Sequence, residues 1–499
     1  MILLDNGRVY AFNETSRRFV RHRSVLIDGA RIVALDETPA GIEVQRRDLQ
    51  GATVLPAFAD CHVHITDTGY FIGERNLGST RSYADYETAV ARLRPEFGVV
   101  FAGQYDESTW SDGASADARI LERCFPDARA MLVRIDGHSC LVNRATLEWL
   151  ALAPDTRGIE RDAQERPTGK LFLDANWRAQ SAFMAALPVE AKRAADRRAV
   201  ELALAHGAVH LHAQLVGFER AEYSVEIEAL RALPGKWYPK VCEPDPHLAV
   251  ELGLPFIGGD VFLDGSIGSC TAALSQPYVG DDATALGELR YSDDQVYAYF
   301  ATAEALGISA GVHAIGDRAI EQCIATWERV LGGKPSIRGT RHFIEHFEIA
   351  RPDHIEACAR MGIFLSMQPQ FDALWGGADR MYDRRLGTAR MRSMNALGRA
   401  LRAGAVLCGG DDSPVCDLNP LMGMQAAVDH HEPAEQLDPH EALAMYTVNA
   451  ACLGVAEMQT GNIRPGLCAD LVVLDADPLD GTAFTACNVL EAIVNGTTH

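Results

Sequence analysis

Two imidazoles at a spacing of two stand out near the start of the chain, in Asp60-Cys61-His62-Val63-His64. This motif ends an apolar, strand-like run, and side chains two residues apart on a strand point to the same face. His62 and His64 can therefore bind one cation through their imidazole nitrogens. Two polar residues at a strand end are also an ordinary structural feature, so the motif alone leaves both interpretations open.

Further imidazoles and a carboxylate occur at the ends of later strand-like runs: His313 in SAGVHAIGD, His346 in RHFIEHFE and Asp412 in VLCGGDDSPV. In a parallel barrel, the carboxyl ends of the strands meet at one rim, where barrel enzymes assemble their active sites. Several imidazoles with one carboxylate suit zinc or a similar divalent ion. The sequence therefore predicts a metal site at this rim.

The elements that must position these residues follow a βα rhythm. Helices with apolar residues every three to four positions are expected at 293–307 and 318–333, on either side of a strand. Such alternation predicts a parallel sheet. Eight strands are predicted at residues 58–64, 208–214, 237–242, 257–264, 309–314, 341–346, 363–369 and 405–411. Setting aside a segment near 70–190 leaves roughly 260 residues, which fits a (β/α)₈ TIM barrel with an insertion after its first strand.

Both ends of the chain read as short strands separated by Asn-Gly and Asp-Gly turns, as in ILLDNG, SVLIDGARIVALDE, ADLVVLDADP and NVLEAIVNG. We expect them to form one small antiparallel β-sandwich domain from residues 1–56 and 457–499. The barrel domain would then occupy residues 57–456, with the insertion at about 70–190.

The composition excludes several classes of partner. The chain has 46 Lys and Arg residues and 68 Asp and Glu residues, which gives a net charge of −22. Surfaces that bind duplexes or membranes normally carry clustered basic residues, so these partners are not expected. No signal-peptide core or membrane span is evident, and the 12 cysteines form no CxxC pair, as expected of reduced thiols. We therefore expect a cytoplasmic protein that acts on a small molecule, with neither nucleic acid nor membrane as partner.

Long stretches of the chain resemble the amidohydrolase superfamily, and within it the amidohydrolase family 3 branch that includes N-substituted formamide deformylases. The resemblance is carried by LPAFADCHVHI, DGHSCLVNRATL, FLDGSIGSCTAALSQPY, GVHAIGDRAI, RHFIEHFEIARPDHI, SMQPQF, GGDDSPVCDLNPL, YTVNAACLG and GNIRPGLCADLVVLDADP. It implies a metal-dependent hydrolase in which one or two divalent cations, most simply zinc, activate water. Barrels of this kind often form dimers, so a homodimer is possible.

The resemblance also assigns roles. His62 and His64 match the ligands on the first strand, His313 the ligand on the fifth, His346 the histidine on the sixth, and Asp412 the metal-binding aspartate on the eighth. Asp411 stands where relatives usually have Ser or Thr, so either aspartate could point inward. The resemblance further implies substrate contacts from His138 and Trp110, and Gln368 would line the pocket because it ends the seventh strand; packing or surface roles are the alternative for all three.

The main departure is Asp260 in GGDVFLDGS, where the family pattern has a lysine. In relatives with two metals, that lysine can be carbamylated and bridge them, which an aspartate cannot reproduce. Two arrangements remain open. In the favoured one, a single ion is held by His62, His64, His313 and Asp412, and His346 polarises the substrate. In the other, Asp260 or another carboxylate, such as Asp264 or Asp174, bridges two ions.

The predicted function is hydrolysis of a non-peptide C–N bond in a small amide, formamide or cyclic amide. Asp412 would accept a proton from the activated water and pass it to the departing nitrogen, while His346 would help to stabilise the oxyanion. A metal-assisted lyase, isomerase or decarboxylase, or a degenerate ligand-binding barrel, are the alternatives. A second HxH pair, His210 and His212, is either structural or an auxiliary contact.

Overall fold

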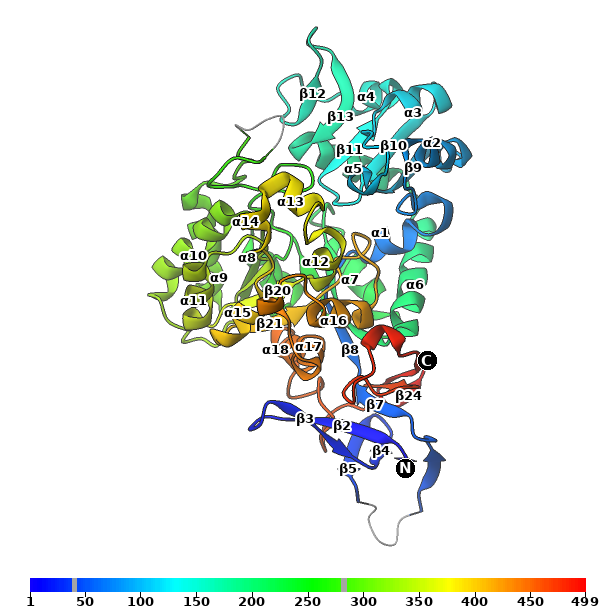
Figure 1. The fold of residues 1–499 in the computed structure, drawn as a ribbon, viewed down its shortest axis with the longest axis vertical. Coiled ribbons are helices and arrows are strands. Elements are labelled where there is room, and N and C mark those ends of the chain that lie inside the picture. The colour runs from blue at the N-terminus through cyan, green and yellow to red at the C-terminus, as the bar shows by residue number, and fades with distance from the viewer. Residues whose placement is uncertain (38–42, 280–284) are drawn as a thin grey trace.

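The computed structural model describes residues 1–37, 43–279 and 285–499. Its centre is a barrel of parallel strands with helices packed around it (Figure 1). The barrel strands are β8 (Phe58–Val63), β14 (Ala208–Leu215), β16 (Lys240–Val241), β17 (Phe256–Ile257), β18 (Ser309–Ala314), β19 (Phe343–His346), β20 (Phe364–Met367) and β21 (Val406–Gly409). These are the strands that the sequence predicts, in the predicted order.

Backbone hydrogen bonds close the barrel between its last and first strands. The Asp412 amide donates to the His62 carbonyl at 2.8 Å, and the His64 amide donates to the Ser413 carbonyl at 2.9 Å. A further bond from the Gly258 amide to the Val241 carbonyl, also 2.9 Å, joins β16 to the segment after β17. The carboxyl ends of the first and eighth strands are therefore held side by side, with His62, His64 and Asp412 beside the seam.

The fourth strand is shorter than the predicted range 257–264. It ends at Ile257 because Gly258 and Gly259 have φ values of +84° and +110°, which are incompatible with a continuing strand and favour glycine. The chain leaves the sheet at this point, and an isolated bridge between Phe262 and His313 is its only return to the ladder among the described residues. Asp260 thus lies in the irregular segment between the end of β17 and this bridge to β18.

Helices connect the strands and cover the outside of the barrel. They are α6 (Val189–Ala205), α7 (Tyr223–Arg231), α8 (Pro246–Leu252), α9 (Asp293–Leu306), α10 (Asp317–Leu331), α11 (Pro352–Met361), α15 (Leu397–Arg402), α16 (Pro420–Val428), α17 (Pro439–Met445) and α18 (Val448–Leu453). The predicted helices correspond to α9 and α10, each ending at a glycine in the left-handed region. In β19, Ile344 packs with the outer helices while Phe343 belongs to the interior cluster, so the inward positions alternate.

The insertion between β8 and α6 contains its own five-stranded sheet, at the upper end of Figure 1. Its strands are β9 (Val99–Tyr105), β10 (Arg129–Arg134), β11 (Ser139–Val142), β12 (Ile159–Arg161) and β13 (Pro167–Phe172). The helices of this region are α1 (Ile65–Tyr70), α2 (Tyr83–Arg92), α3 (Arg119–Cys124), α4 (Arg144–Leu150) and α5 (Leu173–Ala186). Separate hydrophobic clusters pack on its two faces. The helices α12 (Pro369–Trp375), α13 (Met381–Leu386) and α14 (Thr388–Met391) follow β20 and lie between this region and the barrel (Figure 1).

The two chain ends form two small sheets at the opposite end of the molecule (Figure 1). One has the order β5-β4-β1-β6 and the other β24-β23-β22-β7-β2-β3. Their strands are β1 (Ile2–Asp5), β2 (Arg8–Asn13), β3 (Arg18–His22), β4 (Val25–Asp28), β5 (Arg31–Leu35), β6 (Gln45–Asp48), β7 (Thr53–Pro56), β22 (Leu471–Leu474), β23 (Val489–Val494) and β24 (Thr497–Thr498). Both sheets contribute to one hydrophobic core. The antiparallel prediction is only partly right, because β1 pairs with β6, and β2 with β7, in parallel.

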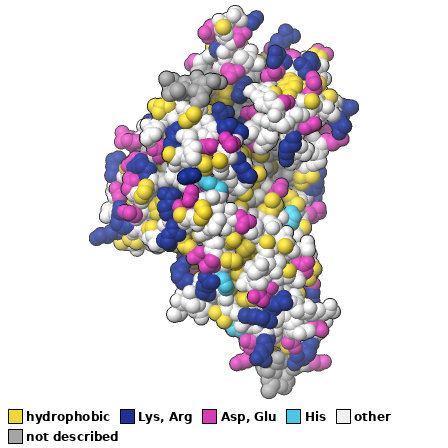
Figure 2. Space-filling view, viewed as in Figure 1, with side chains coloured by type: hydrophobic (Ala, Val, Ile, Leu, Met, Phe, Trp, Pro, Cys, Tyr) yellow, Lys and Arg dark blue, Asp and Glu magenta, His cyan; other side chains and the backbone are white. Residues whose placement is uncertain are grey.

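None of the described helices is long and apolar enough to cross a membrane. On the face drawn in Figure 2, Lys and Arg side chains are interspersed with Asp and Glu.

Candidate metal centre

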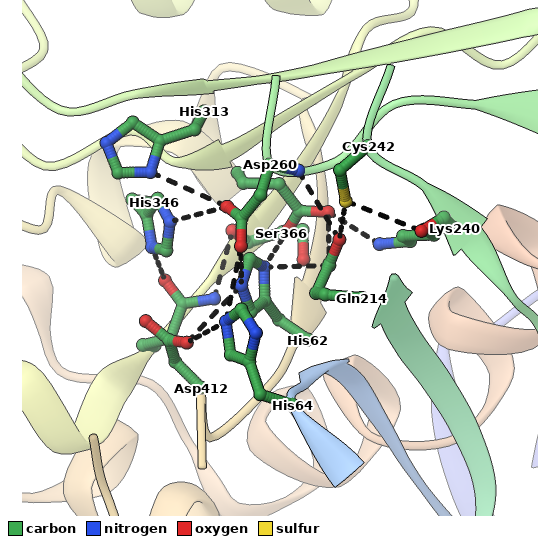
Figure 3. A network of polar contacts seen from close by, with 12 residues as sticks. His62, His64, Gln214, Lys240, Cys242, Asp260, His313, His346, Ser366 and Asp412 are labelled. Atoms are coloured by element: carbon green, nitrogen blue, oxygen red, sulfur yellow. Dashed lines mark hydrogen bonds and ion pairs between the residues drawn. The ribbon is translucent and has the colours of Figure 1, made fainter. Parts of the chain in front are cut away.

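Six side chains from the carboxyl ends of four barrel strands and from the loop after β17 converge at the mouth of the barrel (Figure 3). They are His62, His64, Asp260, His313, His346 and Asp412. Asp260 lies between the others, and the dashed contacts in Figure 3 run from its two oxygens to the surrounding imidazoles. The residues that the sequence places at separate strand ends therefore form one cluster.

The first half of the cluster has the dimensions of a tetrahedral metal site. The Nε2 atoms of His62 and His64 lie 3.3 and 3.2 Å from Asp260 Oδ2, and 3.3 and 3.2 Å from Asp412 Oδ1. Ligands about 2.0–2.1 Å from a tetrahedral zinc ion are separated from each other by about 3.3 Å. All four of these separations match the ligand spacing around one small cation.

The second half faces the other oxygen of Asp260. Oδ1 lies 3.6 Å from His313 Nδ1 and 3.8 Å from His346 Nε2. This set is wider than the first and contains fewer protein ligands. Asp260 consequently presents one oxygen to each pair of histidines, as a bridging carboxylate does.

Four buried atoms of the cluster have no hydrogen-bond partner in the described chain: His62 Nε2, Asp260 Oδ1, His313 Nδ1 and Asp412 Oδ1. Buried polar atoms are normally hydrogen-bonded, and exceptions call for an explanation such as a bound ion. The unpaired nitrogens and oxygens face one another, which is the donor set of a divalent cation. The residues present therefore fit a metal.

The electrostatics of the protein alone lead to the same conclusion. Burial opposes charge on every member, yet the carboxylates Asp260 and Asp412 raise the pKa of His64 to about 10 and hold that of His62 well above its ordinary value. In return, the histidines keep the pKa of both carboxyl groups below the usual range, against the effect of burial. Without a cation, protons on the imidazoles compensate the carboxylates, so cation binding is expected to release protons.

Contacts behind the cluster fix two of the imidazole rings. His62 Nδ1 lies 2.9 Å from Glu345 Oε2, and Glu345 Oε1 lies 2.6 Å from Lys240 Nζ. Lys240 also donates to the Cys61 carbonyl at 2.8 Å. His346 Nδ1 lies 2.8 Å from Gln368 Oε1. In both rings the nitrogen remote from the cluster is held, so Nε2 is the nitrogen that faces it.

A cavity of about 370 Å³ opens from the cluster and is lined by both the barrel and the insertion. His138 lines it and packs against His313, with ring centroids 5.2 Å apart. Burial and the neighbouring His313 lower the pKa of His138 to about 3, so its ring is neutral at pH 7. Aromatic rings form much of the remaining wall, including Trp177 and Phe262, which stack at 4.5 Å.

Other residues singled out in the sequence lie away from the cation-facing atoms. Asp411 is turned outward, where Oδ2 accepts the Asn419 amide at 2.8 Å, so Asp412 is the aspartate in the cluster. Asp264 accepts three backbone amides, from Ala273, Ile315 and Gly316. Asp174 pairs with Arg157 and Arg290 near the surface. These three carboxylates are thus already engaged by other groups.

Three other residues considered from the sequence make packing or hydrogen-bond contacts away from the metal cluster: Trp110, His210 and His212. Trp110 packs against Tyr86, with ring centroids 5.1 Å apart, in a hydrophobic cluster of the insertion and does not line the cavity. His210 lies within hydrogen-bond distance of Tyr238 and Thr460, and His212 stacks on Tyr238 at 4.6 Å. Gln368 contacts His346 and reaches the cluster only through it.

Lys240 and Glu345, which hold His62 from behind, were not predicted from the sequence. A lysine within an otherwise apolar predicted strand was a usable signal, because a buried ammonium group requires an anionic partner. The sequence around Glu345 contains no comparable signal, because the motif RHFIEHFE is already explained by the neighbouring metal-ligand candidate His346.

Comparisons with known proteins identify the family of this chain and several of its relatives. The amidohydrolase family profile (Amidohydro_3) matches residues 45–498. YtcJ of Bacillus subtilis (strain 168) is 28% identical over 93% of this chain and 92% of its own. The N-substituted formamide deformylase of Arthrobacter pascens is 26% identical over 92% of this chain and 91% of its own.

A solved structure shares the fold. An uncharacterized metal-dependent hydrolase from Pyrococcus horikoshii OT3 superposes with a TM-score of 0.75 at 24% identity, covering 97% of this chain and 99% of that one. Since the family profile spans nearly the whole chain, the protein belongs to amidohydrolase family 3.

Proposed function

We propose that the protein is a hydrolase of non-peptide C–N bonds in small amides, formamides or cyclic amides, and that it uses two divalent ions, most simply zinc. The observation that carries the proposal is the position of Asp260, with one oxygen facing His62 and His64 and the other facing His313 and His346. This geometry favours the two-ion arrangement over a single ion.

In this proposal His62, His64 and Asp412 would hold one ion, His313 and His346 would hold the other, and Asp260 would contribute to both sites. Aspartate replaces the bridging lysine of the family pattern without a carbamate, because its carboxylate already lies between the two sets of imidazoles. Ions bound there would supply an activated water and polarise the amide carbonyl. Membership of the amidohydrolase family supports hydrolysis as the reaction.

The protein's own groups supply proton transfer and orientation. Asp412 lines the cavity and carries a carboxylate whose low pKa keeps it ionised at neutral pH. It would accept a proton from the attacking water and deliver it to the departing nitrogen. Gln368 and Glu345 hold His346 and His62 in fixed orientations, so the cluster is organised before substrate binds.

Metal analysis combined with an isotope experiment tests this function. Enzyme reconstituted with zinc or manganese is assayed on N-acyl amides, formamides and cyclic amides in ¹⁸O-labelled water. Hydrolysis must place one solvent oxygen in the carboxylate product, whereas an isomerase or lyase need not. The expected result is two ions per chain, ¹⁸O incorporation, and at least a ~10³-fold loss of kcat in His64→Ala.

His247→Ala is the matched control, because His247 is exposed and is not among the residues that line the cavity. Turnover without ¹⁸O incorporation would reject hydrolysis. Full activity of His64→Ala would reject the site.

A further inference from the structure

One carboxyl group in the wall of the cavity belongs to neither half of the metal cluster. Glu348 follows His346 by two residues and lines the cavity, and its exposed fraction is only 3%. Tyr382 of α13 donates a hydrogen bond to its Oε2 at 2.6 Å, and the Asn395 amide donates to its backbone carbonyl at 2.9 Å. The backbone and one oxygen of Glu348 are therefore held in place.

The other carboxyl oxygen of Glu348 opens onto the cavity. Oε1 accepts no hydrogen bond from the described parts of the chain, and it is not among the atoms that are both fully buried and unpaired. Oδ1 of Asp260 and Oδ1 of Asp412, by contrast, are fully buried. Because Glu348 lines the cavity, the surface that its Oε1 retains faces that space. A molecule bound in the cavity can reach this oxygen.

The protein does not neutralise this carboxyl group. Within the described structure, Tyr382 is the one side chain that hydrogen-bonds to Glu348, and a phenol carries no positive charge. Lys192 is the one Lys or Arg among the described residues that line the cavity, and it lies on α6. A buried carboxylate is unfavourable unless a cation pairs with it. A ligand that carries a positive charge would supply what Glu348 lacks.

The other carboxyl groups of the wall have less to gain from such a ligand. Asp136 is already compensated, because Arg134 lies 2.9 Å from it and Ser266 and Ser269 donate to the same oxygen. Asp67 and Glu222 are more exposed than Glu348, so water can solvate their charge. Glu348 is thus the carboxyl group outside the cluster for which a bound cation matters most.

Aromatic rings lie around Glu348 and also line the cavity. The ring of Trp375 is 6.1 Å from that of Tyr382, and the ring of Phe371 is 5.1 Å from that of Trp375, measured between centroids. Aromatic rings attract cations, and an environment with little water strengthens the attraction between a carboxylate and an ammonium group. The surroundings of Glu348 consequently suit an ammonium ion.

We propose that Glu348 is a specificity-determining residue, whose Oε1 binds the ammonium group of a positively charged substrate. This inference rests on the proposed function for the choice of an amide, and it narrows the substrate class to amides that carry an ammonium substituent. It accounts for the open oxygen, the missing counter-charge and the neighbouring aromatic rings together.

Two small probes of similar size and shape test the charge preference: benzylammonium, which is positively charged, and benzyl alcohol, which is neutral. Their binding to the metal-reconstituted protein is measured by calorimetry or ligand-observed NMR. The wild-type protein should bind benzylammonium at least about 10-fold more tightly, as expected for a charge-assisted hydrogen bond. Glu348→Gln keeps the volume and an acceptor for Tyr382 but removes the charge, so it should lose this preference.

Two controls separate recognition from other roles of a carboxylate near the ions. Glu222→Gln removes an exposed carboxylate from the wall of the same cavity, and it should keep the preference for benzylammonium. Elemental analysis of Glu348→Gln should give the metal content of the wild type. A loss of metal in this variant would show that Glu348 serves the ions and would overturn its role in recognition.

Kinetics extend the test to substrates. N-acetyl diamines of increasing chain length are compared with the N-alkylacetamides in which a methyl group replaces the ammonium group. At the best chain length, kcat/KM should be at least about 10-fold higher for the diamine derivative. The ratio should fall close to one in Glu348→Gln and should persist in Glu222→Gln.

The outcomes can be told apart from those of the functional test. Equal or absent binding of the two probes by the wild-type protein, an unchanged preference in Glu348→Gln, or a lost preference in Glu222→Gln would each overturn the role of Glu348. If amides are hydrolysed without any preference for an ammonium group, the inference fails and the proposed function stands. If ammonium binding depends on Glu348 but no amide is hydrolysed, the ammonium site stands and the proposed function fails.

Discussion

The imidazole of His62 and the carboxylate of Glu345 lie 2.9 Å apart, and neither side chain has any exposed surface. The contact involves Nδ1, the nitrogen that does not face the cluster. A carboxylate in this position orients the ring and raises the basicity of the opposite nitrogen. Glu345 thus acts on the metal centre through His62 without facing the cations itself.

Glu345→Gln should weaken metal binding while preserving the shape of the site. The amide retains the volume of the carboxylate but loses its charge, and such partners are typically worth about 10–100-fold in metal affinity. Competition with a chromophoric chelator measures the change. Glu328→Gln, on the exposed face of α10, serves as the control. Equal zinc affinity in Glu345→Gln and the wild type would contradict the assignment.

Lys240→Met should destabilise the fold, because it removes the ammonium group that lies 2.6 Å from the buried Glu345 carboxylate. Removing one partner of a buried ion pair costs about 3–5 kcal/mol. The double variant Lys240→Met/Glu345→Gln removes the stranded charge and should recover part of this loss. Denaturant unfolding of the metal-free proteins measures both values. A double variant less stable than the single one would show that the pair is not the cause.

Asp260→Asn should reduce the bound metal from two ions per chain to one. An amide can no longer offer an anionic oxygen to each set of histidines, and the second set has fewer protein ligands than the first. Elemental analysis after dialysis measures the stoichiometry. Asp174 is a carboxylate near the surface that pairs with arginines, so the control variant Asp174→Asn should retain both ions. Two tightly bound ions in Asp260→Asn would refute the bridging role.

Acid should weaken the contact between α9 and the segment before β19 through Glu304. Burial opposes its ionisation, but hydrogen bonds from His342, Thr340 and Ser336 lower the pKa of Glu304 from 4.5 to about 2. Because the folded-state pKa is the lower one, the stabilisation is complete above about pH 4.5 and is lost as the pH falls toward 2. The free energy difference between the wild type and Glu304→Gln should shrink over this interval. If the difference in the free energy of unfolding between the wild type and Glu304→Gln stayed constant from pH 6 to pH 3, the lowered pKa of Glu304 would be contradicted.

The barrel could be predicted because its signals are local. Each strand is a short apolar run, each main helix is amphipathic, and the parallel arrangement places the ends of β8, β18, β19 and β21 at one rim. This reasoning brings His62, His64, His313, His346 and Asp412 together from positions up to 350 residues apart. The resemblance to a known family then indicates the chemistry.

The remaining details depend on contacts that no local pattern contains. The place of Asp260 between two sets of imidazoles follows from the early end of β17 at Gly258 and Gly259. The choice of Asp412 over Asp411 depends on the backbone at the barrel seam. The pairing of Glu345 with Lys240 joins two strands that are distant in sequence.

The sheet shared by the two chain ends has a consequence for biosynthesis. β7 pairs with β22 through residues 53–56 and 471–474, so one edge of β7 is completed by residues translated roughly 400 positions later. At typical elongation rates of about 5–20 residues per second, this interval is on the order of 20–80 s. During that time the nascent chain exposes an unpaired apolar edge while the barrel behind it is still emerging from the ribosome, so protection from aggregation matters most for this protein before its last strands appear.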